Sequence, residues 1–213
     1  MTEYLIPTGP GEAEFEEKRS RFLGHVLPVD SESEARAHIE TMKKRYHDAR
    51  HNCWCYLIRN GAVRYSDDGE PQGTAGQPML EVFQREGVTN VCCVVTRYFG
   101  GILLGAGGLL RAYTRSAKDA LDAAGISVVR RWVEVSVTCP YSLFERIKLE
   151  VESFSGLLEE PVFSSDVTIR ALLSEGQVDD FSRRITELSA GSCSVAAIGE
   201  AFRGAPRSKT DFR

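Results

Sequence analysis

The sequence lacks the features that mark membrane-spanning and exported proteins. No apolar run approaches 18 residues, and the N-terminal stretch M-T-E-Y-L-I-P-T-G-P-G-E has no basic region followed by an apolar core. We therefore expect neither a membrane span nor a signal peptide. The six cysteines include no C-x-x-C pair, which argues against a zinc site and a disulfide framework. Because Cys92 and Cys93 are adjacent within an apolar run, we expect buried free thiols and a cytoplasmic protein.

An excess of positive charge is also absent. The 213 residues include 26 Lys and Arg against 30 Asp and Glu, a net charge of -4. This balance excludes a protein that is basic overall, so any RNA-binding surface must be a local patch. The length allows one large domain or two small ones, and either can bury a core.

Glycine is concentrated in the segment Val91 to Tyr113, V-C-C-V-V-T-R-Y-F-G-G-I-L-L-G-A-G-G-L-L-R-A-Y. Residues 91–95 predict a strand buried on both faces, and a helical period begins near Gly107. A glycine loop that leads into a helix N-terminus could hold a phosphate. The Gly-Lys-Ser/Thr and G-x-G-x-x-G spacings of known phosphate motifs are absent. Tight turns and close backbone packing are the alternative explanation for the glycines.

Basic and apolar side chains accompany this loop. Arg111, Arg115 and Lys118 recur on one side of the predicted helix and form a basic stripe, for which a solvated helix face is the ordinary explanation. Within the loop, residues 102–104 are Ile, Leu and Leu. We expect these three to be anchored in the core.

A second loop, Ser66 to Pro78, is polar and rich in glycine and proline. Its acids Asp67, Asp68 and Glu70 could supply oxygen ligands to Mg²⁺, or could cap the turn and face water. Their spacing matches no dedicated cation loop, so we predict neither a metal site nor a cofactor. The sequence contains no G-x-S-x-G or H-E-x-x-H motif, and no catalytic residue is predicted.

The remaining periodicity predicts two α/β (α+β) domains, each of two layers. In residues 1–127 we expect strands at 14–18, 20–28, 53–58, 62–65 and 91–95, and helices from Ser31, around 79–83 and from Gly107 to Gly125. In residues 128–202 we expect the order β-α-β-β-α-β of a ferredoxin-like sandwich, with strands at 132–138, 156–163, 166–173 and 193–198 and a capping box at Ser142. Residues 203–213 are basic and are expected to be a disordered tail.

Four motifs together resemble those of the IMPACT family, in its two-domain bacterial form. They are D-D-G-E-P-x-G-T-A-G-x-P at 67–78, R-Y-F-G-G-I-L-L-G-A-G-G-L at 97–109, S-R-F at 20–22 and D-A-R-H at 48–51. The resemblance implies an N-terminal domain similar to the second domain of a small-subunit ribosomal protein. It also implies a C-terminal domain similar to the last domain of elongation factor G. Both similarities point to RNA or the ribosome.

The family has no established catalytic residues, so the resemblance implies a binding surface. The expected surface for RNA or another ligand comprises Arg50, His51, Asp67, Asp68, Glu70, Thr74, Arg97, Tyr98, Gly100, Gly101, Gly105, Gly107, Arg111 and Arg115. We predict a non-enzymatic cytoplasmic protein that binds RNA or the translation machinery, with no membrane partner, and the resemblance implies a role in regulating translation under stress. The alternatives are an enzyme that uses a Mg²⁺-nucleotide on the glycine-rich loop and a scaffold for protein partners.

Overall fold

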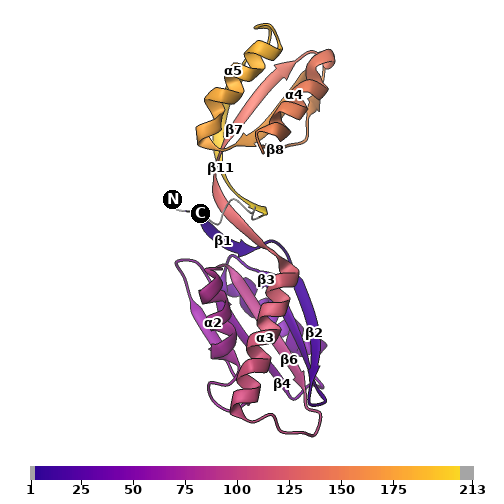
Figure 1. Cartoon of the computed structure of the whole chain (residues 1–213), viewed down its shortest axis with the longest axis vertical. Coiled ribbons are helices and arrows are strands. Elements are labelled where there is room, and N and C mark those ends of the chain that lie inside the picture. Colours follow the sequence, from indigo (N-terminus) through magenta and orange to yellow (C-terminus); the bar gives the residue numbers. More distant parts are fainter. Residues whose placement is uncertain (1–2, 207–213) are drawn as a thin grey trace. The chain divides into compact units, whose positions relative to one another are not determined.

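The structure, a computed structural model, describes residues 3–206 and divides the chain into two compact units (Figure 1). The N-terminal unit comprises Tyr4–Val129 and residues 204–206, and the C-terminal unit comprises Arg130–Arg203 and Glu3. The division falls within one long strand, β7 (Ile126–Cys139). In the described part of the chain, no helix is long and apolar enough to cross a membrane.

The N-terminal unit is built on a five-stranded antiparallel sheet with the strand order β2-β3-β6-β4-β5. Its strands are β2 (Gly11–Glu17), β3 (Ser20–Pro28), β4 (His51–Leu57), β5 (Val63–Ser66) and β6 (Val91–Tyr98). Its helices are α1 (Glu32–Arg45), α2 (Gly76–Glu86) and α3 (Ala106–Ala124).

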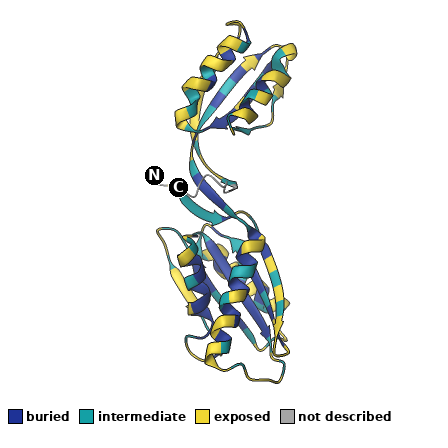
Figure 2. Cartoon of the chain, viewed as in Figure 1, coloured by how far each residue is buried: buried dark blue, intermediate teal, exposed yellow. Residues whose placement is uncertain are grey.

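Strand β6 is central in this sheet and is buried on both faces, as its apolar run predicts (Figure 2). Cys93 and Val95 belong to a core that includes residues of α2 and α3, whereas Cys92 and Val94 belong to a second core with α1. Helices therefore cover both faces, and the unit has three layers. The expectation of two layers was wrong for this unit because the periodicity of α1 does not reveal which face of the sheet it covers.

The C-terminal unit has the sheet order β11-β7-β10-β8, and β9 also pairs with β10. After β7 come α4 (Tyr141–Ser153), β8 (Leu157–Leu158), β9 (Val162–Phe163), β10 (Val167–Leu173), α5 (Val178–Leu188) and β11 (Val195–Pro206). Ile147 of α4 and Phe181 of α5 pack with Val135 and Val137 of β7 in one core. The chain is thus an α+β protein with two antiparallel sheets and five α-helices in the described residues.

Several boundaries differ from those that the sequence predicts. Strand β1 (Tyr4–Pro7) was not expected, and it pairs with the first residues of β7. Residues 203–206, expected in the tail, form the end of β11, and residues 207–213 lie outside the described residues. Helix α4 is preceded by Pro140 and has no side-chain cap, so the capping box at Ser142 was wrong. All six cysteines are free and buried, as expected.

Two histidines lie where α1 covers the sheet. His25 of β3 is buried against the Tyr46 ring, with Glu12 Oε1 3.2 Å from its Nδ1. Burial lowers the pKa of His25, and the nearby Arg45 adds to this effect while Glu12 opposes it. Burial also lowers the pKa of His38 in α1, and the charge of His25 lowers it further. The folded state therefore favours neutral imidazoles at both positions.

We predict that acid destabilises this unit through these histidines. In the unfolded chain both should titrate near about pH 6.5, so stability is fully present above that pH and is lost as the pH falls toward the lower folded-state pKa values. For each histidine, the unfolding free energy should fall by up to about 1.4 kcal/mol for each pH unit below about pH 6.5. Urea denaturation at about pH 7.5 and about pH 5.5 should show a smaller pH effect in H25Q and H38Q than in the wild type. Equal pH effects in all three proteins would contradict the assignment.

Candidate functional site

The glycine-rich loop joins β6 to α3 beside the hairpin that connects β2 to β3. The Gly100 N–H donates to Ser20 Oγ at 3.2 Å, and a Cβ on Gly100 would lie 2.0 Å from the Arg19 carbonyl oxygen. Gly101 and Gly105 have φ values of +86° and +73°, which glycine adopts readily. Close packing therefore explains Gly100, and turning of the chain explains Gly101 and Gly105.

Helix α3 begins at this loop without a capping side chain. Its N-cap is Gly105, and its first turn contains no acidic residue. The Leu109 N–H donates to the Gly105 carbonyl oxygen as the helix begins, and Gly107 lies in the same turn, near Arg111 Nη1. An uncapped first turn presents N–H groups and the positive end of the helix dipole.

A pocket of about 340 Å³ lies beside the start of α3. Five apolar side chains and the backbone of two glycines and an alanine supply most of its lining: Pro71, Phe99, Leu103, Leu104, Leu109, Gly69, Gly105 and Ala106. Four polar side chains complete it: Arg50, His51, Glu70 and Arg97. The two glycine-rich loop segments, 66–78 and 97–109, thus meet at one pocket, and all four polar residues belong to the predicted surface.

A buried ion pair forms part of the pocket lining. Arg97 Nη1 donates to Glu70 Oε1 at 2.7 Å, and the two side chains are only 6% and 3% exposed. The Tyr113 hydroxyl donates to the same oxygen at 2.8 Å. Burial raises the pKa of Tyr113, and the neighbouring Cys53 and Glu70 raise it further, so this hydroxyl remains a donor. Arg97 was expected on the surface, but the central position of β6 buries it.

One buried atom of this ion pair is left without a partner in the described range. Arg97 Nε is buried without a hydrogen bond, while Glu70 accepts two hydrogen bonds at Oε1. His51 pairs with Arg97 in the strand register, and its Nδ1 lies 2.8 Å from the Asp68 carbonyl oxygen. Because a carbonyl oxygen only accepts, Nδ1 carries a proton. His51 Nε2 then lies 4.0 Å from Glu70 Oε1.

The other predicted residues of the polar loop hold the loop itself together. Asp67 accepts the backbone N–H groups of Gly73, Ala75 and Gly76 at 2.8 to 3.1 Å. Asp68 accepts the N–H of Asn52 at 2.7 Å and lies 3.4 Å from Lys43 Nζ. The Thr74 hydroxyl donates to the Pro71 carbonyl at 2.7 Å. Across residues 3–206 no three His, Cys, Asp or Glu side chains are placed to hold a metal ion.

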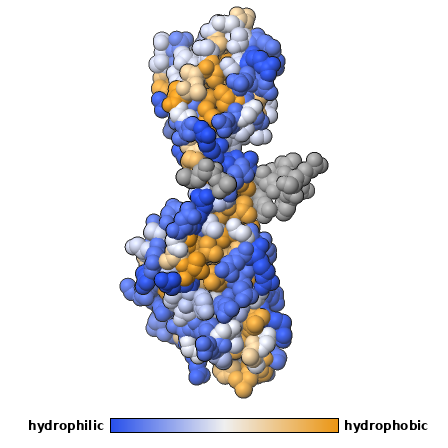
Figure 3. Space-filling view, turned by 90° about the vertical axis from the view of Figure 1, so that its left-hand side faces the viewer, coloured by the Kyte–Doolittle hydropathy of each residue, from blue (hydrophilic) through white to orange (hydrophobic). Residues whose placement is uncertain are grey.

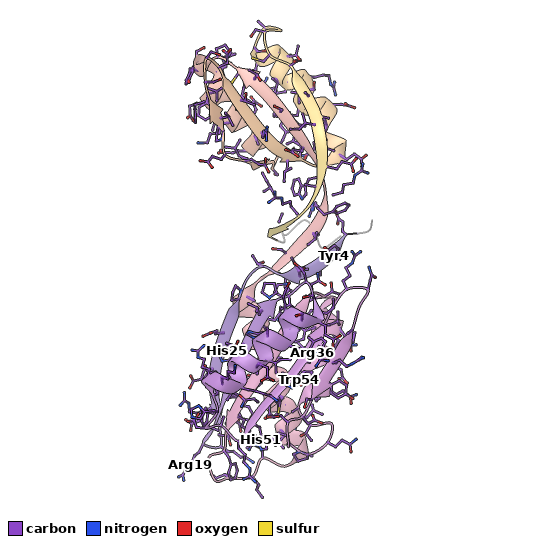
Figure 4. All side chains as sticks on the ribbon, turned by 180° about the vertical axis from the view of Figure 1, so that it is seen from behind. Tyr4, Arg19, His25, Arg36, His51 and Trp54 are labelled. Atoms are coloured by element: carbon purple, nitrogen blue, oxygen red, sulfur yellow. The ribbon has the colours of Figure 1, made fainter. Side chains whose placement is uncertain are left out.

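Unpaired cations surround the loop. None of the following four forms an ion pair within the described residues: Lys18, Arg19, Arg50 and Arg111. Arg50 lines the pocket, while Lys18 and Arg111 line an adjacent hollow of about 240 Å³. The Arg19 backbone packs on Gly100, and Arg19 and His51 lie at the same end of the unit (Figure 4).

The predicted basic stripe is largely neutralised. Arg115 lies 3.2 Å from Asp119, and Lys118 pairs with Asp122 and with Glu86. The Tyr98 hydroxyl is likewise engaged, because it donates to Asp48 at 2.7 Å. Arg111 is thus the one cation of the stripe that the described residues leave unpaired.

The tip of the loop is apolar and exposed, and Figure 3 shows apolar side chains gathered at this end of the unit. Ile102 is 43% exposed and Leu103 is 81% exposed, so the expectation that they anchor the loop in the core was wrong. Only Leu104 packs against the core. The Phe99 ring is 41% exposed, and the Arg97 guanidinium lies 5.4 Å from its centroid.

The buried ion pair leads to a stability prediction. R97A leaves the Glu70 carboxylate buried and uncompensated, which should lower the unfolding free energy by about 3 to 5 kcal/mol. R111A removes an exposed, unpaired cation and should change it by less than about 0.5 kcal/mol. Chemical denaturation of the two variants beside the wild type measures both effects. Similar small effects in both variants would show that the pair does not support the fold.

Comparison with known proteins agrees with the sequence motifs. A model of the Impact N-terminal domain matches residues 18–121, and a model of a domain of unknown function (DUF1949) matches residues 137–192. The chain is 39% identical to the IMPACT family member YvyE of Bacillus subtilis (strain 168), over 90% of this chain and 89% of that protein. It is 33% identical to the IMPACT family member YigZ of Escherichia coli (strain K12), over 94% and 100% of the two chains.

The fold is also similar to a solved one. A crystal structure of a hypothetical protein, 33% identical, covers 93% of this chain and 98% of its own, with a TM-score of 0.58. The family models account for both units, and the two relatives match this chain over nearly its whole length. The chain therefore belongs to the IMPACT family, in its bacterial form with an Impact N-terminal domain and a DUF1949 C-terminal domain.

Proposed function

We propose that this protein is a non-enzymatic binder of single-stranded RNA, in the cytoplasm and in connection with the translation machinery, and that the glycine-rich loop of its N-terminal unit makes the contact. The observation that carries this proposal is the set of four unpaired cations around the loop, Lys18, Arg19, Arg50 and Arg111. In a chain of net charge -4, such a local cluster is the kind of patch that neutralises phosphates.

The Phe99 ring supports RNA rather than an isolated anion as the ligand. It is exposed at the same loop, and an exposed aromatic ring can stack a base regardless of its sequence, which contributes about 1 to 3 kcal/mol per base. The uncapped N-terminus of α3 adds N–H donors for a phosphate between the ring and the cations. Cations, aromatic ring and helix start together supply the elements of single-strand binding.

The alternative of a Mg²⁺-nucleotide enzyme has less support. The Asp67 carboxylate already accepts three backbone N–H groups, so binding a metal would cost the loop these bonds. Asp68 accepts a backbone N–H and lies near Lys43, and Glu70 is paired with Arg97. None of the three acids is free to hold a cation without disrupting a local contact.

The C-terminal unit fits the same proposal. Its strand order β11-β7-β10-β8 is consistent with the ferredoxin-like arrangement that the β-α-β-β-α-β pattern predicts. Similarity to the last domain of elongation factor G, which the family resemblance implies, would associate this unit with the ribosome. We assign the proposed RNA contact to the N-terminal unit, because the four unpaired cations around the loop lie there.

The test is the salt dependence of binding to a short single-stranded RNA, measured by fluorescence anisotropy between about 50 and about 200 mM salt. With four phosphates neutralised, the log-log slope should be about -3. R50A/R111A should weaken binding and reduce the slope by about 1.4.

The matched control changes two other arginines of the same unit. Arg64 of β5 and Arg85 of α2 do not line the pocket or the adjacent hollow, so R64A/R85A removes the same charge elsewhere. This control should bind like the wild type. Absent or salt-insensitive binding, or equal losses in the two double variants, would overturn the proposal.

A further inference from the structure

We propose that the pocket beside the start of α3 takes one nucleotide of the bound strand, with the phosphate at the α3 N-terminus and Arg50 and with the base against Phe99. This inference rests on the proposed RNA binding and adds a defined site within it. The alternative is a contact along the strand in which every nucleotide is equivalent and none enters the protein.

The phosphate position follows from three parts of the pocket lining. Gly105 and Ala106 bring the uncapped helix start to the pocket, and Arg50 lines it without an ion partner in the described residues. N–H groups at a helix N-terminus favour an anion, and a guanidinium binds phosphate with directed N–H donors. The Glu70 charge, which would repel a phosphate, is offset by Arg97 at 2.7 Å.

A second observation points to a ligand with a hydrogen-bond acceptor. Arg97 lines the pocket and its side chain is only 6% exposed, but its Nε is buried without a hydrogen bond within the described residues. A buried N–H donor without a partner is costly. A carbonyl oxygen or ring nitrogen of a nucleobase can accept a hydrogen bond from it. The pocket therefore offers a donor to a base beside the apolar lining that the base would cover.

The apolar part of the pocket lining is the surface that would contact the base. Phe99, Leu103, Leu104 and Leu109 face the pocket, and Phe99 and Leu103 are left largely exposed when it is empty. A base in contact with them would bury apolar surface that the protein alone leaves in water. This explains why the loop keeps apolar side chains at an exposed tip.

The size of the pocket suits one nucleotide. Its volume of about 340 Å³ is at the lower end of the range for small-molecule sites, roughly 300 to 1,000 Å³. The neighbouring nucleotides of a strand would continue toward the adjacent hollow, which Lys18 and Arg111 line. The inserted nucleotide should therefore depend on Arg50 and Phe99. The flanking phosphates should depend on Lys18 and Arg111 instead.

This separation defines the experiment. The full-length protein is titrated by calorimetry with each of the four nucleoside 5′-monophosphates, with the parent nucleosides and with inorganic phosphate, and by anisotropy with a short single-stranded RNA. A monophosphate should bind at one site per chain, more tightly than its nucleoside or phosphate. F99A should weaken it about tenfold or more, and R50Q should weaken it about fivefold or more.

R111Q is the matched control, because Arg111 is an unpaired arginine at the same loop that does not line the pocket. It should change monophosphate binding less than about twofold and should still weaken RNA binding. Thermal unfolding of R50Q and R111Q without ligand should match the wild type, since both arginines are exposed. F99A removes a ring that contacts Arg97 and should still unfold in one cooperative transition.

The outcomes distinguish this inference from the proposed function. RNA binding without any monophosphate binding would overturn the inserted nucleotide and leave the RNA contact standing. Phosphate binding as tight as the monophosphates, or binding unchanged by F99A, would also overturn it. Failure of both RNA and monophosphates would overturn the inference together with the proposed function.

Discussion

The ion pair between Glu70 and Arg97 joins the two loops on which the site depends. Glu70 lies in the polar loop and Arg97 lies near the end of the central strand β6, and their 2.7 Å contact is almost fully buried. The Tyr113 hydroxyl of α3 donates to the same carboxylate, and Arg97 reaches Ser20 of β3 at 3.3 Å. A single carboxylate thus links a loop, a strand and a helix. Without it, Arg97 would be a buried charge in the pocket lining.

This arrangement leaves the positive charge of the rim available to a ligand. The buried acid and base neutralise each other, so the field above the pocket is set by Arg50, the start of α3 and the cations of the β2–β3 hairpin. Asp67 has a comparable role in the polar loop, where it accepts three backbone N–H groups. The acids beside the proposed RNA surface therefore hold that surface together through contacts within the protein.

The sequence predicts the local parts of this design well. The apolar run 91–95 and the helical period after Gly107 correspond to β6 and α3, and the two glycine-rich loops meet at one pocket. Prediction from sequence fails where packing between residues distant in the chain determines the structure. Arg97 follows a buried run, yet its burial requires Glu70, which is distant in sequence. Leu103 is apolar but is 81% exposed, and β1 is too short to be recognised without its partner strand β7.

The central claim is that single-stranded RNA contacts the glycine-rich loop of the N-terminal unit. Ultraviolet crosslinking of the full-length protein to a short single-stranded RNA, followed by mass spectrometry of the peptides, locates the contact directly. The account predicts crosslinks in the peptides that contain Phe99 and the Lys18–Arg19 hairpin, with loss of the first in F99A. Crosslinks confined to residues 130–203, or to α1 and β5 on the N-terminal unit, would contradict it.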